Sequence, residues 1–232
     1  MTIFKSSFDD VEVRELTITE CVFEALSKRP NDVVLTDGVT GETLTAEQLM
    51  EGVKSFAGGL TSRNLGKDHV IALMAPNMPA YAVVFHGVAW AGGTITTMNP
   101  AYTEHEVHHQ LIDSKAEILI TIPAFLETAK AAIEGTGVQD IFVIGKADGA
   151  ASIDSLMGPK IESQVPVDLD NHIVVLPYSS GTTGLPKGVM LSHRNLVVNL
   201  DQIIACADVR EGDVAPAFLP FFHIYGMMVM LN

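Results

Sequence analysis

Basic residues and cysteines are both scarce in this chain of 232 residues. Its 14 Lys and Arg residues are outnumbered by 28 Asp and Glu residues, which gives a formal net charge of −14. Because this charge repels phosphate backbones and anionic lipids at long range, we expect neither nucleic acid nor an anionic membrane as a partner. The two cysteines, Cys21 and Cys206, lie far apart and form neither a metal-binding pair nor a disulfide framework, which is typical of a reducing compartment.

Long uninterrupted apolar stretches are also missing. Residues 1–16 carry acidic side chains where a secretion signal would need continuous apolar sequence. The most membrane-like segment, residues 214–232, is interrupted by Pro216, Pro220 and His223 and is barely long enough to cross a bilayer. No solenoid repeat or low-complexity tract is visible. We therefore expect a cytoplasmic protein without a membrane span.

What the chain does have is 47% hydrophobic residues, arranged in alternating helical and strand patterns. Thr17 with Glu20 and Thr45 with Gln48 fit capping boxes, and each predicts an amphipathic helix. Apolar runs without alternation predict strands that are covered on both faces. The predicted strands are 70–75, 94–98, 117–121, 141–145, 172–178, 188–192 and 214–220, and further helices are predicted at 80–91, after Thr103, at 123–134 and at 195–207. This order predicts an α/β fold with a largely parallel sheet flanked by helices.

A mixed, polar stretch at residues 146–171 contains several glycines and prolines and predicts a surface excursion with at most one short helix. We take it as a seam between a first α/β subdomain, residues 1–171, and residues 172–232, which carry a glycine-rich loop and begin the next subdomain. The chain stops inside an apolar pattern, so we expect a truncated product or fragment that exposes apolar surface and self-associates. The residues expected in that surface are Phe221, Phe222, Met227, Met228, Val229, Met230 and Leu231.

The segment with the most chemical information is YSSGTTGLPKG, residues 178–188. Its small residues leave backbone N–H groups accessible, its hydroxyls add donors, and Lys187 adds a mobile cation, which together can bind phosphate. It is not a Walker loop, because Lys187 follows Pro186 and no Ser or Thr follows the lysine. It also lacks the glycine spacing of the dinucleotide fingerprint. A hairpin turn without a ligand remains open as an alternative.

The longer stretch YSSGTTGLPKGVMLSHRNL closely resembles the phosphate-loop signature of the adenylate-forming acyl-CoA synthetase and luciferase superfamily. Three more segments resemble this superfamily in the same order, namely VIALMAPNMPAYAVVFHGVAWAGG, NPAYTEHEVHHQLIDSKAEILIT and FLPFFHIYGM. The details of NPAYT, PKGVMLSHRNL and FFHIYG look closest to the coumarate-CoA ligase-like branch, beside the fatty-acid-CoA ligases. The resemblance extends from about Thr17 onward and implies a partial N-terminal large domain of the acyl-CoA synthetase fold.

What the resemblance implies is an AMP-forming acid-CoA ligase. Such an enzyme activates a carboxylic acid with MgATP to acyl-AMP and then transfers the acyl group to coenzyme A. By resemblance, Lys187 and His223 would be catalytic, and His223 and Tyr225 would contact the acyl substrate. The residues that would bind ATP are Ser179, Ser180, Gly181, Thr182, Thr183, Gly184 and Lys187. From the residues alone, His223 could equally be a hydrogen-bonded core histidine and Tyr225 a packing aromatic.

Members of the superfamily continue beyond the length of this chain and carry there a magnesium-binding acid, a ribose-binding carboxylate and a mobile C-terminal domain. We therefore expect this chain to be the N-terminal part of an adenylating domain, inactive on its own, and we predict no metal ligands within it. A non-catalytic nucleotide-binding fragment remains an alternative. A zinc hydrolase is another, because His105, Glu106 and His109 match H-E-x-x-H, although Ile112 breaks the longer metzincin pattern and a solvated helix face explains the same charges.

Overall fold

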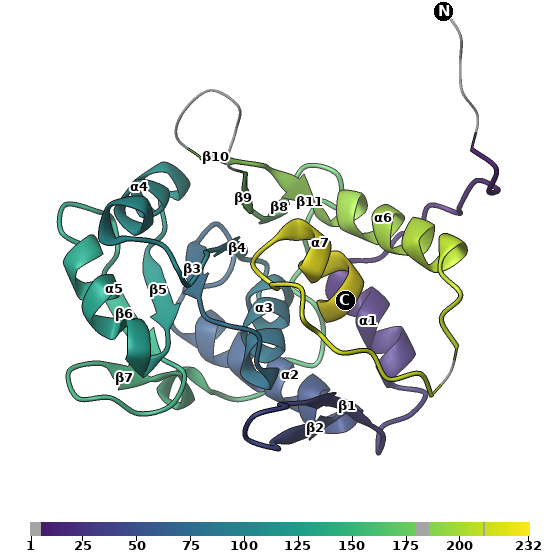
Figure 1. Cartoon of the computed structure of the whole chain (residues 1–232), viewed down its shortest axis with the longest axis horizontal. Coiled ribbons are helices and arrows are strands. Elements are labelled where there is room, and N and C mark those ends of the chain that lie inside the picture. Colours follow the sequence, from purple (N-terminus) through teal and green to yellow (C-terminus); the bar gives the residue numbers. More distant parts are fainter. Residues whose placement is uncertain (1–5, 180–185, 211) are drawn as a thin grey trace, which may run out of the picture.

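The computed structural model describes residues 6–179, 186–210 and 212–232 (Figure 1). In this part of the chain one sheet has seven strands. From one edge to the other these are β11 (Leu191–Ser192), β8 (Ile173–Val175), β4 (Thr94–Thr97), β3 (Val70–Met74), β5 (Ile118–Thr121), β6 (Asp140–Val143) and β7 (Ala151–Ser152). Neighbouring strands are parallel throughout, except that β11 runs antiparallel to β8. The predicted α/β fold with a largely parallel sheet is confirmed.

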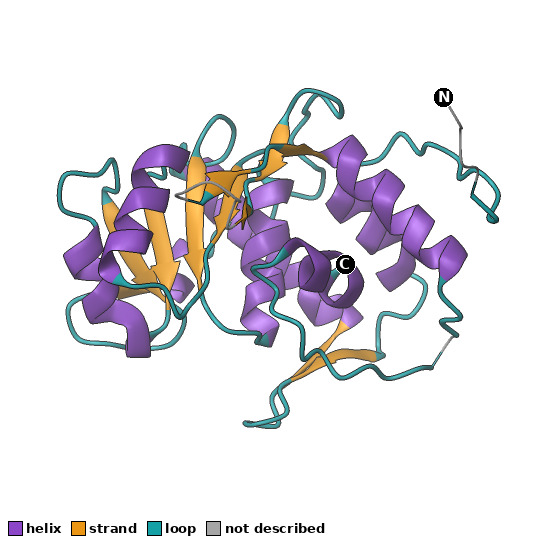
Figure 2. Ribbon diagram, turned by 45° about the horizontal axis from the view of Figure 1, so that its top comes forward, coloured by secondary structure: helices purple, strands orange, loops and turns teal. Residues whose placement is uncertain are grey.

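Helices pack against both faces of this sheet and create two hydrophobic cores (Figures 1 and 2). The larger core involves α1 (Ile18–Leu26), α2 (Ala46–Ser62), α3 (Pro79–Trp90) and α6 (His193–Cys206), and the smaller core involves α4 (Glu104–Ser114) and α5 (Leu126–Ala132). Along β3, Ile71 and Leu73 face the larger core, whereas Ala72 and Met74 face the smaller one. Since successive side chains of a strand point to opposite faces, the unbroken apolar run at residues 70–74 fits a strand covered on both sides.

Local sequence signals account for the starts of these helices. The capping boxes of Thr17 and Thr45 are both formed, and a third one, between Thr103 and Glu106, begins α4. The helix α3 begins with Pro79, which suits a first helical turn because that turn needs no N–H donor there. These starts agree with the predicted helices.

The excursion at residues 146–171 packs on α2. It contains β7, the antiparallel bridge between Ala147 and Ala150, and a short 3-10 helix, η2 (Ile153–Leu156). Gly58 and Gly59 in α2 permit this contact, because a Cβ atom at Gly58 would lie 1.7 Å from the carbonyl oxygen of Pro159. The elements that were not predicted include the hairpin β1 (Val33–Thr36) and β2 (Thr43–Thr45) and the short strand β7. The helix predicted at 123–134 begins as the 3-10 turn η1 (Pro123–Phe125) and continues as α5.

The predicted strand at residues 214–220 is wrong. The structure gives this segment no strand, and Phe218 within it is 75% exposed. Two prolines, Pro216 and Pro220, remove N–H donors that a strand would need, so the apolar pattern there does not pair with a sheet. The segment instead runs across the molecule as an extended loop (Figure 1).

Seven apolar residues between Phe221 and Leu231 were expected to be exposed, and this expectation is wrong for four of them. Phe221, Met227, Met228 and Leu231 are buried in the larger core. Phe221 lies before the short helix α7 (Ile224–Gly226), and the other three belong to the π-helical turn η3 (Met227–Leu231), which packs against α6. The remaining three, Phe222, Val229 and Met230, are half-buried.

The sheet continues across the predicted seam, because β8 follows residue 171 and pairs with β4, which precedes it, while β11 pairs with β8. The division into subdomains at this position remains a prediction. None of the helices among the described residues is long and apolar enough to cross a membrane.

Candidate functional site

Two short strands flank the predicted phosphate loop. In β9 (Tyr178–Ser179) and β10 (Lys187–Gly188), Ser179 pairs with Lys187 and Tyr178 pairs with Gly188. Of the predicted ATP-binding residues, Ser179 and Lys187 are thus brought together, and both are exposed. The other five, Ser180, Gly181, Thr182, Thr183 and Gly184, lie outside the described residues. We call Tyr178–Ser179 together with Pro186–Gly188 the loop base.

The loop base contacts α4. The hydroxyl of Tyr178 donates a hydrogen bond of 2.5 Å to the carboxylate of Asp113. On the other strand, Nε2 of His109 lies 3.2 Å from the carbonyl oxygen of Pro186, and since a carbonyl only accepts, this ring nitrogen carries the proton. Burial, and then the bonded carboxylate of Asp113, raises the pKa of Tyr178. Tyr178 therefore stays a neutral donor at physiological pH.

The segment FFHIYG is held above the carboxyl ends of β3 and β4. Asn77, just after β3, donates from Nδ2 to the carbonyl oxygens of Ala217 and Leu219, at 2.8 Å each, and its Oδ1 accepts from the N–H of Phe221 at 2.8 Å. The hydroxyl of Thr97, the last residue of β4, donates to the carbonyl oxygen of Phe222 at 2.8 Å.

Neither Asn77 nor Thr97 is among the site residues predicted from the sequence. Asn77 lies inside a segment that the resemblance covers, and its position directly after a buried strand is the available signal.

The two predicted acyl-site residues lie at the start of α7. His223 is exposed, and its Nδ1 accepts from the N–H of Tyr225 at 3.3 Å, which caps the helix. Tyr225 is 60% exposed. The alternative that His223 is a core histidine is therefore wrong. Within the described part of the chain, no hydrogen bond or ion pair joins this pair to Ser179 or Lys187, so the structure forms two groups of site residues.

The residues of the H-E-x-x-H match have other contacts. The carboxylate of Glu106 accepts from the N–H and the hydroxyl of Thr103 at 2.8 Å each, and these bonds lower the pKa of Glu106. His105 is exposed, and His109 binds the loop base. Over residues 6–179, 186–210 and 212–232, no three His, Cys, Asp or Glu side chains converge where they could hold a metal ion. The residues of the motif thus form the first turns of α4, and His109 contacts the loop base.

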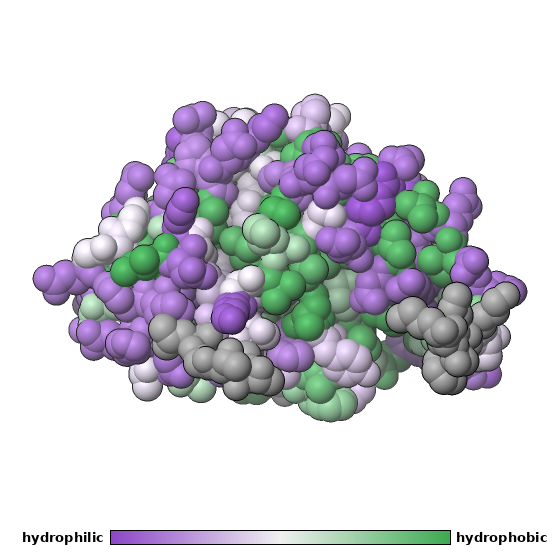
Figure 3. Space-filling model, turned by 90° about the horizontal axis from the view of Figure 1, so that it is seen from above, coloured by the Kyte–Doolittle hydropathy of each residue, from purple (hydrophilic) through white to green (hydrophobic). Residues whose placement is uncertain are grey.

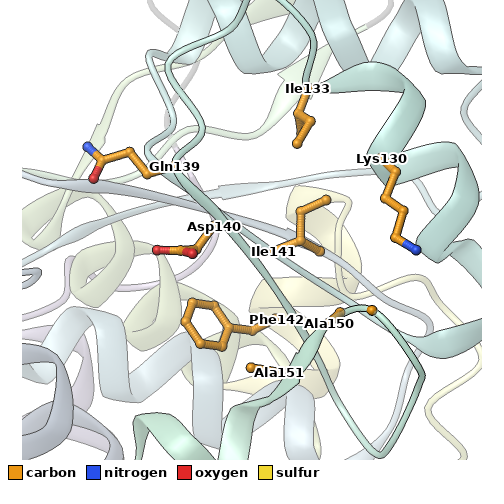
Figure 4. Close-up of a pocket in the computed structure, with 9 residues that line it drawn as sticks. Lys130, Ile133, Gln139, Asp140, Ile141, Phe142, Ala150 and Ala151 are labelled. Atoms are coloured by element: carbon orange, nitrogen blue, oxygen red, sulfur yellow. The ribbon is translucent and has the colours of Figure 1, made fainter.

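A cavity of about 450 Å³ lies elsewhere, between α5 and the β6–β7 edge of the sheet (Figure 4). Its only cationic lining side chain, Lys130, is paired with Glu127 at 3.1 Å. The apolar side chains of Ile133, Ile141 and Phe142 form much of the rest of the lining. Gln139 and Asp140 also line the cavity, but their side chains point away from Lys130, so the polar groups do not converge as they would in a specific ligand site (Figure 4).

Comparison with known proteins places the chain in a family. The sequence profile of the AMP-binding enzymes matches residues 22–232. The chain belongs to the AMP-binding enzyme family. This matched region includes α4, the loop base and FFHIYG, and the resemblance described from the sequence is confirmed at the level of the family.

Relatives of this AMP-binding family member include 4-coumarate–CoA ligase 5 of Oryza sativa subsp. japonica, which is 36% identical over 237 residues, with 99% of this chain and 43% of the relative covered. Among solved structures, a long-chain-fatty-acid-CoA ligase from Archaeoglobus fulgidus superposes with a TM-score of 0.88 at 25% identity, covering 98% of this chain and 47% of that one. ATP-bound MatB from Rhodopseudomonas palustris superposes with a TM-score of 0.75 at 25% identity, covering 90% and 42%.

The chain therefore spans less than half the length of these AMP-binding enzymes, and the part it matches is their N-terminal domain. The coumarate-CoA ligase-like and fatty-acid-CoA ligase likeness expected from the sequence is confirmed by these relatives.

Proposed function

We propose that this chain is the part of an AMP-forming acid-CoA ligase that holds the phosphates of ATP. The single observation that carries the proposal is the pairing of Ser179 with Lys187 at the base of a glycine-rich loop, in a chain of the AMP-binding family. Ligands of open α/β sheets bind at the carboxyl ends of the strands, where FFHIYG also lies. The ATP-bound structure of the relative MatB supports ATP as the nucleotide.

The proposed reaction has two steps. A carboxylate oxygen of the acid attacks the α-phosphorus of MgATP, the bond to the β-phosphate breaks, and pyrophosphate leaves with the electron pair. The thiol of coenzyme A then loses its proton, its sulfur attacks the acyl carbon, and AMP leaves. Lys187 and the hydroxyl and N–H donors of the loop would stabilise the charge that develops on pyrophosphate, and one such donor contributes about 3 kcal/mol in comparable sites.

For the acid, we propose an apolar aryl or fatty acid. His223 and Tyr225 would lie beside it, with Phe222, because these side chains are exposed or half-buried in FFHIYG. Met227 and Met228, which follow FFHIYG in the chain, are buried in the larger core and do not line this site. A higher specificity constant for acetate than for such acids in a thioester assay of the complete enzyme would contradict this assignment.

The activity of the chain by itself is a separate proposal. Since it spans about 43% of the length of its curated relatives, we propose that it binds ATP but does not complete adenylation. We further propose that the protein is cytoplasmic. We also propose that it self-associates, because Val189, Met190 and Ile204 are exposed and one face carries a group of apolar side chains (Figure 3). Acid-dependent exchange of pyrophosphate into ATP by the purified chain would contradict the proposed inactivity, and a strictly monomeric chain in analytical ultracentrifugation would contradict self-association.

The decisive experiment measures binding of MgATP to the purified chain by isothermal titration calorimetry. We expect Lys187→Ala to weaken binding by about tenfold, since it removes a cationic contact to phosphate. Lys146→Ala is the matched control, because it removes the same charge from an exposed position that follows β6, four strands away from β8 in the sheet. Equal affinities for wild type and Lys187→Ala, or no binding at all, would contradict the proposed function. Binding without any adenylation in the complete protein would favour a non-catalytic nucleotide-binding module.

A further inference from the structure

One face of α4 contacts both strands of the loop base. Asp113 accepts from the hydroxyl of Tyr178 in β9 at 2.5 Å, and His109 donates to the carbonyl oxygen of Pro186, directly before Lys187, at 3.2 Å. The two α4 residues are four positions apart and therefore lie above one another on the same side of the helix. Each binds the neighbour of a predicted phosphate-binding residue, Ser179 on one strand and Lys187 on the other.

The ring of Tyr178 completes this arrangement. Tyr178 lies opposite Gly188 in the β9–β10 pair, and a Cβ atom at Gly188 would lie only 3.1 Å from Cζ of the ring. The ring therefore lies against the backbone of the opposite strand, and its hydroxyl end is held by Asp113. A change in the position of this ring would displace both strands of the loop base together.

A third α4 side chain fixes the helix to the sheet at the same place. Gln110 is buried, and its Nε2 donates to the hydroxyl of Thr96 at 2.8 Å and to the carbonyl oxygen of Thr97 at 3.1 Å. The hydroxyl of Thr96 in turn donates to the carbonyl oxygen of Leu176 at 2.9 Å, two residues before Tyr178. Because these bonds are buried, α4 cannot shift without losing them, and it provides a rigid support.

We propose that Asp113 and His109 are positioning residues for the ATP-phosphate site: from α4, they set where Ser179 and Lys187 are held relative to each other. The proposal rests on the function proposed above. It also gives a role to the histidine-rich part of α4, whose His109 matched the zinc motif but binds a carbonyl oxygen of the loop base.

The charge of Asp113 and its hydrogen bond predict opposite effects on ATP affinity when the side chain is removed. Its carboxylate lies beside a site proposed to bind polyphosphate, so its negative charge taken alone repels ATP, and its removal would tighten binding. As a hydrogen-bond acceptor, however, it holds Tyr178, and its removal would weaken binding. Asp113→Asn removes the charge and keeps an acceptor, whereas Asp113→Ala removes both, so the two variants separate the effects.

The test measures the dissociation constant of MgATP for the full 232-residue chain by titration calorimetry, with the melting temperature recorded for every variant. We expect Asp113→Ala and Tyr178→Phe each to weaken binding by about threefold to tenfold, the value of one hydrogen bond, and the double variant to be no weaker than either single one. Asp113→Asn should bind within about twofold of wild type or more tightly.

His109 is tested in the same way. His109→Ala should weaken binding by about threefold, and His109→Gln should restore it, because the glutamine amide can donate to the carbonyl oxygen of Pro186 from a similar position. His105→Ala is the matched control, since His105 is an exposed histidine of the same helix and makes no contact with the loop base. It should bind as wild type does.

Two results would overturn the proposal. One is that Asp113→Ala and Tyr178→Phe bind ATP as well as wild type or better; the other is that Asp113→Asn loses as much affinity as Asp113→Ala. If Asp113→Ala fails to fold, Tyr178→Phe tests the same bond from the other side. A chain in which Lys187→Ala weakens binding but no α4 variant does would retain the proposed function and refute only the positioning role. A wild-type chain that does not bind ATP would refute both.

Discussion

Residues 70–121 and residues 212–226 are held in the molecule by different means. The first region forms β3, α3, β4, α4 and β5, and its strands are hydrogen-bonded to one another in the centre of the sheet. The second region is an extended loop and a short helix whose backbone is held by the side chains of Asn77 and Thr97, which belong to the first. The first region, which we call the scaffold, is thus stabilised mainly by buried apolar area, whereas the loop that carries His223 and Tyr225 depends on a few specific hydrogen bonds.

The largest effect is expected from damage to the scaffold. Leu73 in β3 is completely buried in the larger core, so Leu73→Ala should lower the free energy of unfolding by about 2 to 5 kcal/mol through lost burial and a residual cavity. Chemical denaturation measures this loss. Val39→Ala is the control, since Val39 is 97% exposed and its truncation should change stability by less than about 0.5 kcal/mol. A Leu73 variant as stable as the control would refute the distinction between the two regions.

A smaller and more local effect is expected at Asn77. Asn77→Ala removes three hydrogen bonds to the backbone of residues 217–221, which should cost about 2 to 4 kcal/mol. Hydrogen exchange should become faster at the amide of Phe221, while amides of β3 remain protected as in wild type. If the amides of β3 lost protection from hydrogen exchange to the same extent, the two regions would unfold as one cooperative unit, which would contradict the difference between them.

The pH dependence should come from the surroundings of α1, where two buried histidines contact the first turn of this helix. His86 Nδ1 lies 3.1 Å from the hydroxyl of Thr19, and His193 Nδ1 accepts from the N–H of Ile18 at 3.2 Å. Burial lowers the pKa of His86 to about 4, and burial followed by the neighbouring His172 lowers the pKa of His193 to about 3. Their neutral forms are therefore favoured in the folded state.

The unfolded state binds these protons first, at its ordinary pKa of about 6.5, so the histidines contribute full stability above that pH and lose it as pH falls toward the folded pKa values. Between pH 6.5 and pH 5, the protonation of each histidine in the unfolded state should lower the free energy of unfolding by about 2 kcal/mol. Denaturation of wild type and His86→Gln at both pH values measures this slope, which should be shallower in the variant. Identical slopes would show that His86 does not titrate on unfolding in this range.

The smallest effect is expected at Thr97. Thr97→Val removes the hydroxyl that donates to the carbonyl oxygen of Phe222 and should cost about 1 kcal/mol. Thr43→Val is a suitable control, because Thr43 is exposed in β2. The two variants are compared by their melting temperatures. A loss for Thr97→Val no greater than for Thr43→Val would show that Asn77 alone holds this end of FFHIYG.

The outcome at residues 214–220 shows where sequence patterns stop being informative. The apolar runs of β3 and β5 predicted strands, and the structure has them, because both faces of those strands are covered by helices close in sequence. The similar run at 214–220 predicted a strand and does not form one. Its place is decided by Asn77, about 140 positions earlier, and no local pattern contains such a contact.

By itself, the sequence determined the α/β class, the order of the main helices and strands, the starts of α1 and α2, and the family, because short-range periodicity, capping residues and a distinctive loop carry that information. Only the tertiary structure decided which residues meet. It buried Met227 and Met228, exposed His223 and Tyr225, and placed His109 and Asp113 of α4 on the loop base. The physical reason is that hydrogen bonds and burial between distant segments depend on how the layers pack, which local propensities do not specify.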